Sequence, residues 1–163
     1  MGPTVFETEG ATRVDVRAEA LINRAFLRVI HTGSREQIVV MSLPPYAEIG
    51  AEVHADTDQL FVVIEGNGEA HVGDYELAVQ AGDLVFVAAG TRHNLINRAT
   101  LPMHLIAVLA PPAYAPGTVI ETMPVPEPPV EQPWRAFPWV PESSGLDGAD
   151  FSSATDDDGS QAS

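Results

Sequence analysis

The chain has 163 residues, a net charge of −15 at pH 7 and no cysteine. The strong negative charge argues against a nucleic-acid backbone or an anionic membrane as partner. Without cysteine there are no disulfides, thiolate metal ligands or cysteine nucleophiles, so any metal must be held by histidine, carboxylate or amide groups. No apolar run has the length of a membrane span or the pattern of a signal peptide, and we expect a cytoplasmic protein.

Short β-rich runs fill the chain from residue 20 to residue 110. Turn residues separate them, and no helical period of 3.6 residues lies between them. Such a pattern predicts an antiparallel all-β sandwich or barrel. The runs are AFLRVI, QIVVMSL, QLFVVIEG, EAHVGDYELAV, DLVFVAA, HNLIN and MHLIAVLA.

Two glycine-containing turns divide the middle of this region. Residues 66–68 (Gly-Asn-Gly) and 72–74 (Val-Gly-Asp) have the composition of hairpin turns, because glycine, Asn and Asp accept positive φ at low steric cost. We therefore predict that strands 59–65, 69–72 and 75–79 form an antiparallel meander.

The character of the chain changes after residue 110. Ten of the fourteen prolines lie between residues 111 and 141, and their missing N–H groups forbid an ordinary central strand. Residues 113–141 are therefore predicted to be a Pro-rich extension. Residues 142–163 hold six acidic residues and no basic one. This composition has too little apolar surface to offset the entropy of ordering, and it predicts a disordered acidic tail.

Polar residues cluster near the ends of two predicted strands. Glu52 and His54 share a face by the two-residue period of an extended chain, as do His93 and Leu95 in the later strand. Gln59 begins the apolar strand that follows His54. If these faces line a barrel interior, two imidazoles, a carboxylate and an amide converge in an apolar cavity.

The stretch from residue 82 to residue 97 resembles the second sequence motif of the cupin superfamily. That motif is Gly, five residues, Pro, one residue, Gly, two residues, His, three residues and Asn. The corresponding residues here are Gly82, Ala88 in the proline position, Gly90, His93 and Asn97.

This resemblance implies a cupin-type jelly-roll β-barrel over residues 36–112, with the Pro-rich and acidic segments as a C-terminal extension. It also implies an N-terminal segment, residues 1–35, that pairs strands in a homodimer.

The first cupin motif is His-x-His, three or four residues, Glu, six residues and Gly. With its last glycine at Gly66, Gln59 takes the glutamate position, His54 the second histidine position and Glu52 the first. An alternative register makes His54 the first ligand and Asp56 the second, but only two residues then separate Asp56 from Gln59.

The resemblance implies one divalent metal ion, held by Glu52, His54, Gln59 and His93, with Asp56 as the rival carboxylate. This set carries one negative charge, whether Glu52 or Asp56 supplies the carboxylate. The family's usual set of three neutral histidines and one glutamate carries the same charge. A nitrogen and oxygen set without sulfur suits Mn, Fe, Ni or Zn. Four protein ligands on an octahedral ion leave two positions for a substrate, and the ion would act there as a Lewis acid.

The barrel mouth is expected to hold an apolar pocket suited to a small, partly apolar substrate. The predicted lining residues are Met41, Phe61, Val63, Phe86 and Leu95. We therefore predict a metal-dependent enzyme with oxygenase, isomerase or lyase chemistry on a small oxygenated organic molecule. The alternative is a non-catalytic module that binds a small molecule in the barrel and a partner through the acidic tail.

Overall fold

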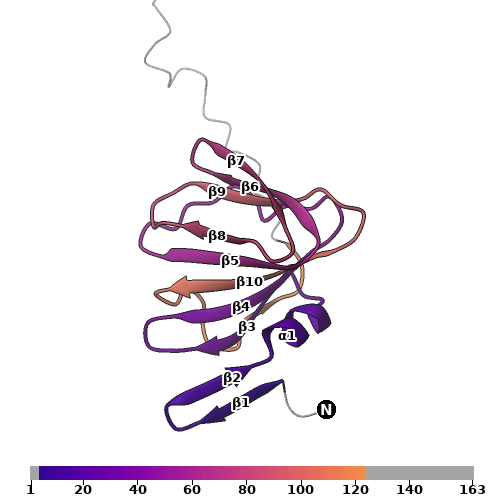
Figure 1. The fold of residues 1–163 in the computed structure, drawn as a ribbon. Helices are drawn as coiled ribbons and strands as arrows, with labels where there is room; N and C mark the ends of the chain where they lie inside the picture. Colours follow the sequence, from indigo (N-terminus) through magenta and orange to yellow (C-terminus); the bar gives the residue numbers. More distant parts are fainter. Residues whose placement is uncertain (1–3, 124–163) are drawn as a thin grey trace, which may run out of the picture. The chain divides into compact units, whose positions relative to one another are not determined.

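The computed structural model describes residues 4–123, and their fold is almost entirely β, as the sequence predicts (Figure 1). In chain order the elements are β1 (Val5–Thr8), β2 (Ala11–Val14), α1 (Val16–Ile22), β3 (Leu27–Thr32), β4 (Gln37–Leu43), β5 (Asp58–Glu65), β6 (Asn67–Val72), β7 (Tyr75–Gln80), β8 (Leu84–Val87), β9 (His93–Asn97), β10 (Met103–Ala110) and β11 (Val119–Ile120).

Two antiparallel sheets form the layers of a jelly roll. The larger sheet has the strand order β11-β3-β4-β10-β5-β8, and the smaller has the order β7-β6-β9. Side chains that alternate inward from both sheets build one apolar core, and its burial is the main favourable contribution to folding. Its largest fully buried side chains include Val39, Leu43, Val63, Leu95, Met103 and Leu105.

The chain passes from one sheet to the other at Gly66, so the predicted meander is wrong at its first connection. β5 pairs with β10 and β8, whereas β6 pairs with β7 and β9. Gly66 has φ +97°, and a Cβ there would lie 3.0 Å from the Cα of Met103. The corner therefore needs glycine for its backbone angle and for the close approach of β10. The predicted hairpin between β6 and β7 is confirmed.

Helix α1 is an element that the strand pattern does not predict. It has seven residues, too few to show a clear helical period, and Asp15 caps it by accepting a hydrogen bond from Ala18 N–H at 3.0 Å. Ala20 packs on Val40 and Ile106, on the outer face of the larger sheet. The helix thus covers an apolar patch that would otherwise be open to water.

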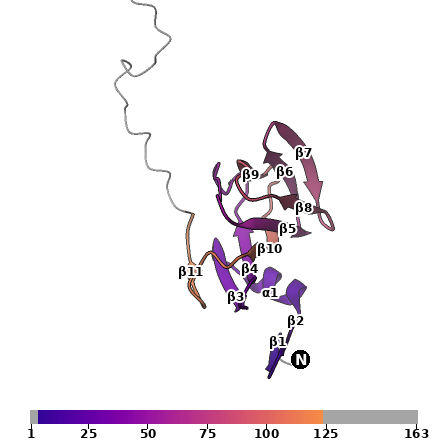
Figure 2. The same cartoon turned by 90° about the vertical axis from the view of Figure 1, so that its left-hand side faces the viewer.

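The barrel extends beyond the predicted limits of 36 and 112 at both ends. β3 belongs to the larger sheet, and β11 pairs with β3 along its edge (Figure 2). The first part of the Pro-rich extension is therefore part of the fold. Its remainder and the predicted disordered tail, residues 124–163, lie outside the described residues. No helix of the described part is long and apolar enough to cross a membrane.

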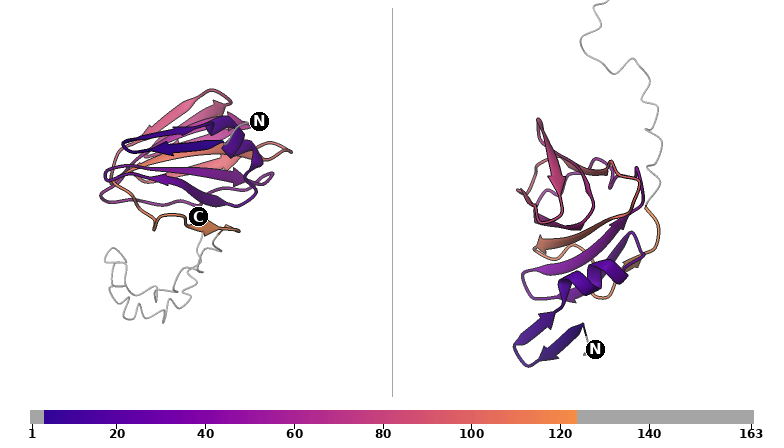
Figure 3. Two further views of the ribbon diagram at one scale, coloured as in Figure 1. Left: turned by 90° about the horizontal axis from the view of Figure 1, so that it is seen from below. Right: turned by 45° about the vertical axis from the view of Figure 1, so that its right-hand side comes forward.

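The hairpin of β1 and β2 stands apart from the two sheets (Figure 3). Its residues are mostly exposed, and it pairs with no other strand of the described region. Asp15 N–H donates to Thr4 O at 2.7 Å, and Glu7 Oε1 lies 3.3 Å from His31 Nδ1. The first bond continues the hairpin's own ladder, and the second contact joins the hairpin to β3.

Candidate metal centre

Backbone hydrogen bonds tie together the two segments that resemble cupin motifs. Glu52 and His93 form an antiparallel bridge in which each N–H donates to the other's carbonyl oxygen at 3.0 Å. Gly90 N–H donates to His54 O at 2.8 Å. These bonds hold the loop before β5 against the start of β9. Glu52, His54 and His93 are thereby placed on adjacent stretches of backbone.

The side chains of Glu52, His54 and His93 converge. One ligand atom from each lies within 4.8 Å of the other two. Glu52 Oε1 is 3.4 Å from His54 Nε2 and 3.6 Å from His93 Nε2. The His93 side chain is 1% exposed, whereas those of His54 and Glu52 are 23% and 40% exposed. The cluster is therefore closed at His93 and open to solvent at Glu52.

His93 is oriented with one ring nitrogen bound and the other free. Its Nδ1 lies 3.0 Å from the carbonyl oxygen of Thr91, which can only accept, so Nδ1 carries the proton in the neutral ring. Nε2 is then unprotonated and buried, and no group in the described part of the chain forms a hydrogen bond with it. The ring also packs beside Phe61, with 5.9 Å between centroids. Metal-ligating histidines are commonly held in this way through the second ring nitrogen.

The charges in the cluster shift the pKa values of its members. Burial disfavours the ionised form of Glu52, but the imidazoles of His93 and His54 outweigh this effect and lower the pKa of the carboxyl group. Burial also disfavours protonated His93, yet Glu52 and the Thr91 carbonyl raise its pKa above the usual 6.5. Glu52 is therefore an anionic oxygen donor at neutral pH.

Gln59 adds an amide to the same region. It is the second residue of β5, is 3% exposed, and lines a small cavity together with Glu52. Its carbonyl oxygen Oε1 has no hydrogen-bond partner among the described residues. A buried acceptor left unpaired costs about 1–3 kcal/mol, so this atom is a candidate ligand for a cation.

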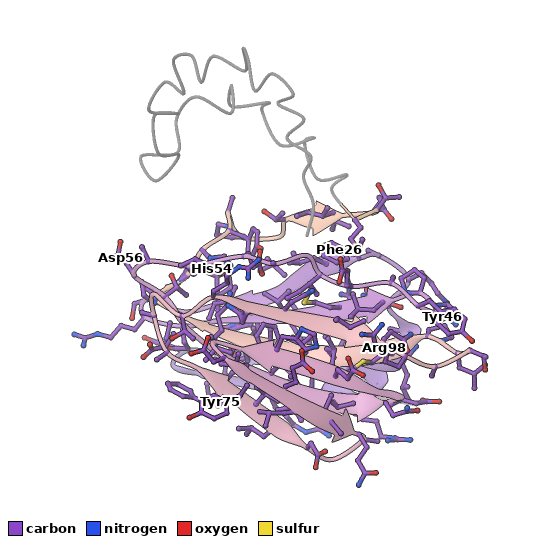
Figure 4. All side chains as sticks on the ribbon, turned by 90° about the horizontal axis from the view of Figure 1, so that it is seen from above. Phe26, Tyr46, His54, Asp56, Tyr75 and Arg98 are labelled. Atoms are coloured by element: carbon purple, nitrogen blue, oxygen red, sulfur yellow. The ribbon has the colours of Figure 1, made fainter. Side chains whose placement is uncertain are left out.

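Asp56, the rival carboxylate, lies outside the cluster. It is exposed in the turn before β5 and is not among the converging groups. Figure 4 shows Asp56 at the outer edge of this loop, with His54 nearer to the strands. Glu52, and not Asp56, is therefore the carboxylate that converges with the two histidines.

The cavity beside the cluster is small, about 20 Å³, which is room for one water molecule. Met41 and Phe61, two of the predicted lining residues, lie in its wall. Val63 and Leu95 are buried in the core instead. The apolar part of the wall consists of Leu27, Val39, Met41, Phe61, Ala107 and Leu109.

The prediction that Phe86 lines the pocket is wrong, because this side chain is 56% exposed. In β8 the residues opposite the inward Gln59 and Phe61 of β5 are Val87 and Val85. Residues paired across strands share a face, so Val85 and Val87 point inward and Phe86 points outward.

Tyr114 is a site residue that the sequence reasoning missed. It lies after β10, in the segment treated as a Pro-rich extension, yet it lines the cavity with Glu52 and Gln59. Burial raises the pKa of the Tyr114 phenol, and the charge of Glu52 raises it further. No spacing rule connects Tyr114 to the two motifs, and its aromatic ring among prolines is the only sequence signal.

Asn97, the last residue of the second motif, has a structural role. It is fully buried, and its Nδ2 donates to the carbonyl oxygens of Leu43, Pro44 and Leu101 at 2.8–3.1 Å. Its Oδ1 accepts from Ala99 N–H at 2.9 Å. These bonds hold the chain after β9 against the end of β4, and they leave Asn97 no free atom for a ligand.

The residues present fit a divalent cation. Two unpartnered imidazole nitrogens and an unpartnered amide oxygen lie in the same region as an ionised carboxylate. Zn²⁺ and similar ions take nitrogen and oxygen donors at about 2.0–2.2 Å, and donors within 4.8 Å of one another need only small shifts to meet at one ion.

Comparison with known proteins agrees with this fold. The cupin domain model matches residues 39–109. The chain is 32% identical over 115 residues to the uncharacterized protein YrkC of Bacillus subtilis (strain 168), covering 67% of this chain and 62% of YrkC. It is 34% identical over 110 residues to an uncharacterized protein of Acanthamoeba polyphaga mimivirus, covering 65% of this chain and 69% of that protein.

A crystal structure from Bacillus halodurans superposes with a TM-score of 0.66 at 34% identity, over 68% of this chain and 88% of that one. The jelly roll, the paired motifs and these matches define the class of protein. The chain belongs to the cupin family.

Proposed function

We propose that this protein is a metal-dependent enzyme that acts on a small oxygenated organic molecule. One divalent ion, Mn, Fe, Ni or Zn, would be held by Glu52, His54, Gln59 and His93. The two open positions on such an ion would receive the substrate. Oxygenase, isomerase and lyase chemistry are all compatible with this arrangement.

The observation that carries the proposal is the set of unpaired buried atoms around one carboxylate. The Nε2 atoms of His54 and His93 and the Oε1 atom of Gln59 are all buried without a hydrogen-bond partner in residues 4–123. A purely structural polar cluster would pair such atoms with one another or with backbone groups, because unpaired buried polar atoms are destabilising. A cation satisfies all of them at once.

Each part of the site contributes a separate property. A bound divalent ion supplies Lewis acidity toward a substrate oxygen. Glu52 provides the one negative charge of the ligand set, and Thr91 keeps His93 in the tautomer whose Nε2 can bind. The apolar wall around Phe61 keeps water from the inner side, while the exposed side at Glu52 gives a substrate access to the site.

Elemental analysis of protein purified without added metal tests the proposal. We expect close to one equivalent of metal per chain, and a gain in Tm when Mn, Fe, Ni or Zn is returned to chelator-treated protein. His93→Gln should abolish both effects. His71→Gln is the matched control, because His71 lies on β6 beside Glu69 and outside the cluster. Metal content below about 0.1 per chain, with no gain in Tm, would refute the proposal.

The homodimer is also a proposal, and the N-terminal hairpin supports it. A two-stranded hairpin alone is marginally stable in water, and β1 and β2 leave Phe6 54% exposed. A second copy could supply the missing contacts. Light scattering should show a dimer for the full chain and a monomer after removal of residues 1–14; an unchanged mass would contradict this role. The cytoplasmic location stays a prediction that cell fractionation would test.

A further inference from the structure

The backbone of Tyr114 is clamped at the cavity by a fully buried glutamine. Tyr114 N–H donates to Gln37 Oε1 at 3.0 Å, and Gln37 Nε2 donates to Tyr114 O at 2.9 Å. Gln37 Nε2 also donates to Thr32 Oγ1 at 2.9 Å, and Gln37 has no exposed surface. A buried amide satisfied in this way is rigid, so it fixes where the Tyr114 side chain begins.

The chain that follows Tyr114 is held as well. Val29 N–H donates to Thr118 O at 2.9 Å, and Val119 and Ile120 pair with β3. The segment between β10 and β11 is therefore anchored on both sides of Tyr114. Tyr114 packs against the core cluster and lines the cavity, so it is a fixed part of the cavity wall.

The cavity has an unusual balance of groups for a site that binds an oxygenated molecule. Among the described residues that line it, six are apolar and Tyr114 is the one that carries a hydroxyl group. The chain has no lysine, and no arginine of the described residues lines this cavity. A doubly charged substrate group would therefore have no counter-cation there besides a bound metal.

We propose that Tyr114 is the substrate-positioning and size-limiting residue of this site. Its hydroxyl donates a hydrogen bond to an oxygen of a substrate whose head group occupies the open metal positions, and its ring limits the size of that substrate. The inference rests on the proposed metal-dependent function, and it narrows the substrate class. The substrate is a short, neutral or singly charged molecule with two chelating oxygens and one further acceptor.

Glycolate is a suitable probe, because it chelates through its hydroxyl and one carboxylate oxygen and leaves the other oxygen for Tyr114. Mandelate has the same chelating group and an added phenyl ring. Both are titrated calorimetrically into Ni(II)-loaded wild type, Tyr114→Phe and Tyr114→Ala. Tyr75→Phe is the matched control, because Tyr75 is 73% exposed on β7. Metal content and Tm are measured on every sample.

We expect Tyr114→Phe to weaken glycolate binding about fivefold to tenfold with full metal content, as the loss of one hydrogen bond of about 1 kcal/mol predicts. Tyr114→Ala should raise the ratio of mandelate to glycolate affinity about tenfold, because the phenyl ring of mandelate can then take the space that the tyrosine ring leaves. Tyr75→Phe should match the wild type in both respects. If Tyr114 had only a structural role, its replacement would change Tm and leave the ratio of mandelate to glycolate affinity unchanged.

Two results would overturn the inference. If Tyr114→Phe binds glycolate within about twofold of wild type, the Tyr114 hydroxyl makes no hydrogen bond to the ligand. If Tyr114→Ala leaves the ratio of mandelate to glycolate affinity unchanged, the tyrosine ring does not limit the size of the ligand. Either result on fully metal-loaded protein refutes the role of Tyr114 and leaves the metal site standing. Wild-type protein that takes up no Ni(II) refutes the metal site and this inference together.

Discussion

Replacement of Glu52 by glutamine should remove most of the stabilisation that a metal gives this protein. The change keeps the size of the side chain and removes the charge that lies 3.4 and 3.6 Å from the two histidine nitrogens. Asp56→Asn removes the same charge from an exposed turn residue and is the matched control.

The magnitude follows from binding linkage. A ligand at 100 times its Kd stabilises the folded state by about 2.7 kcal/mol. Changes in groups that merely support metal ligands already cost 10–100-fold in affinity, so loss of the Glu52 charge should cost about 100-fold or more. At the same metal concentration the variant would then gain about 0.4 kcal/mol. For a domain of this size, these values correspond to about 10 °C and about 1–2 °C in Tm.

The assay is calorimetry of chelator-treated protein with and without added metal. Wild type and Asp56→Asn should show the large gain in Tm, and Glu52→Gln should show almost none. The reverse pattern, with the gain lost in Asp56→Asn and kept in Glu52→Gln, would refute the assignment of Glu52 as the anionic ligand.

Three further predictions concern the strands, the helix and the ligand set. Gly68→Ala should lower the free energy of unfolding by about 3 kcal/mol or more, because its Cβ would lie only 2.0 Å from Ile96 O across the β6–β9 pair; denaturant unfolding measures this. Glu19 is bound to Arg28 at 2.7 Å, and the hydrogen bonds and charge of its neighbours lower its pKa below 4.5 against the effect of burial. A carboxyl group whose pKa is lower in the folded than in the unfolded state stabilises the fold at pH values above its unfolded pKa, and this stabilisation is lost as the pH falls. Glu19→Gln should therefore cost about 1–3 kcal/mol at pH 7 and progressively less below about pH 4.5. Gln59→Glu should lower the Tm of metal-free protein and raise metal affinity; a metal-free Tm equal to wild type would contradict the buried position of this side chain.

The parts of the site that the sequence could predict are those governed by short spacings. The distance from Gly82 to His93 spans one strand and one turn, so local rules place the histidine at the start of β9. The two-residue period likewise puts Glu52 and His54 on one face. Local backbone geometry determines such features, and one sequence is enough to read them.

Other features depend on contacts between distant parts of the chain. All four residues of β8 are apolar, so alternation does not show which face Phe86 takes, and the pairing with β5 decides it. The corner at Gly66 has the composition of a hairpin turn, and the proximity of Met103 reveals its true role. Tyr114 reaches the cavity through its bonds to Gln37, which is 77 residues away. Sequence spacing carries no information on any of these contacts.

The departure from the first cupin motif makes physical sense once burial is considered. Glu52 carries the negative charge at the open side, where its side chain is 40% exposed, while neutral Gln59 occupies the inner position at 3% exposure. A glutamate at position 59 would have its charge buried. Without a metal to pair with, that buried charge would destabilise the fold by several kcal/mol. With the proposed ligand set, this exchange would keep one negative charge at the site but place it where water can solvate it. We therefore expect the metal-free protein to fold without an unpaired buried anion, and to depend less on metal for folding than it would with a glutamate at position 59.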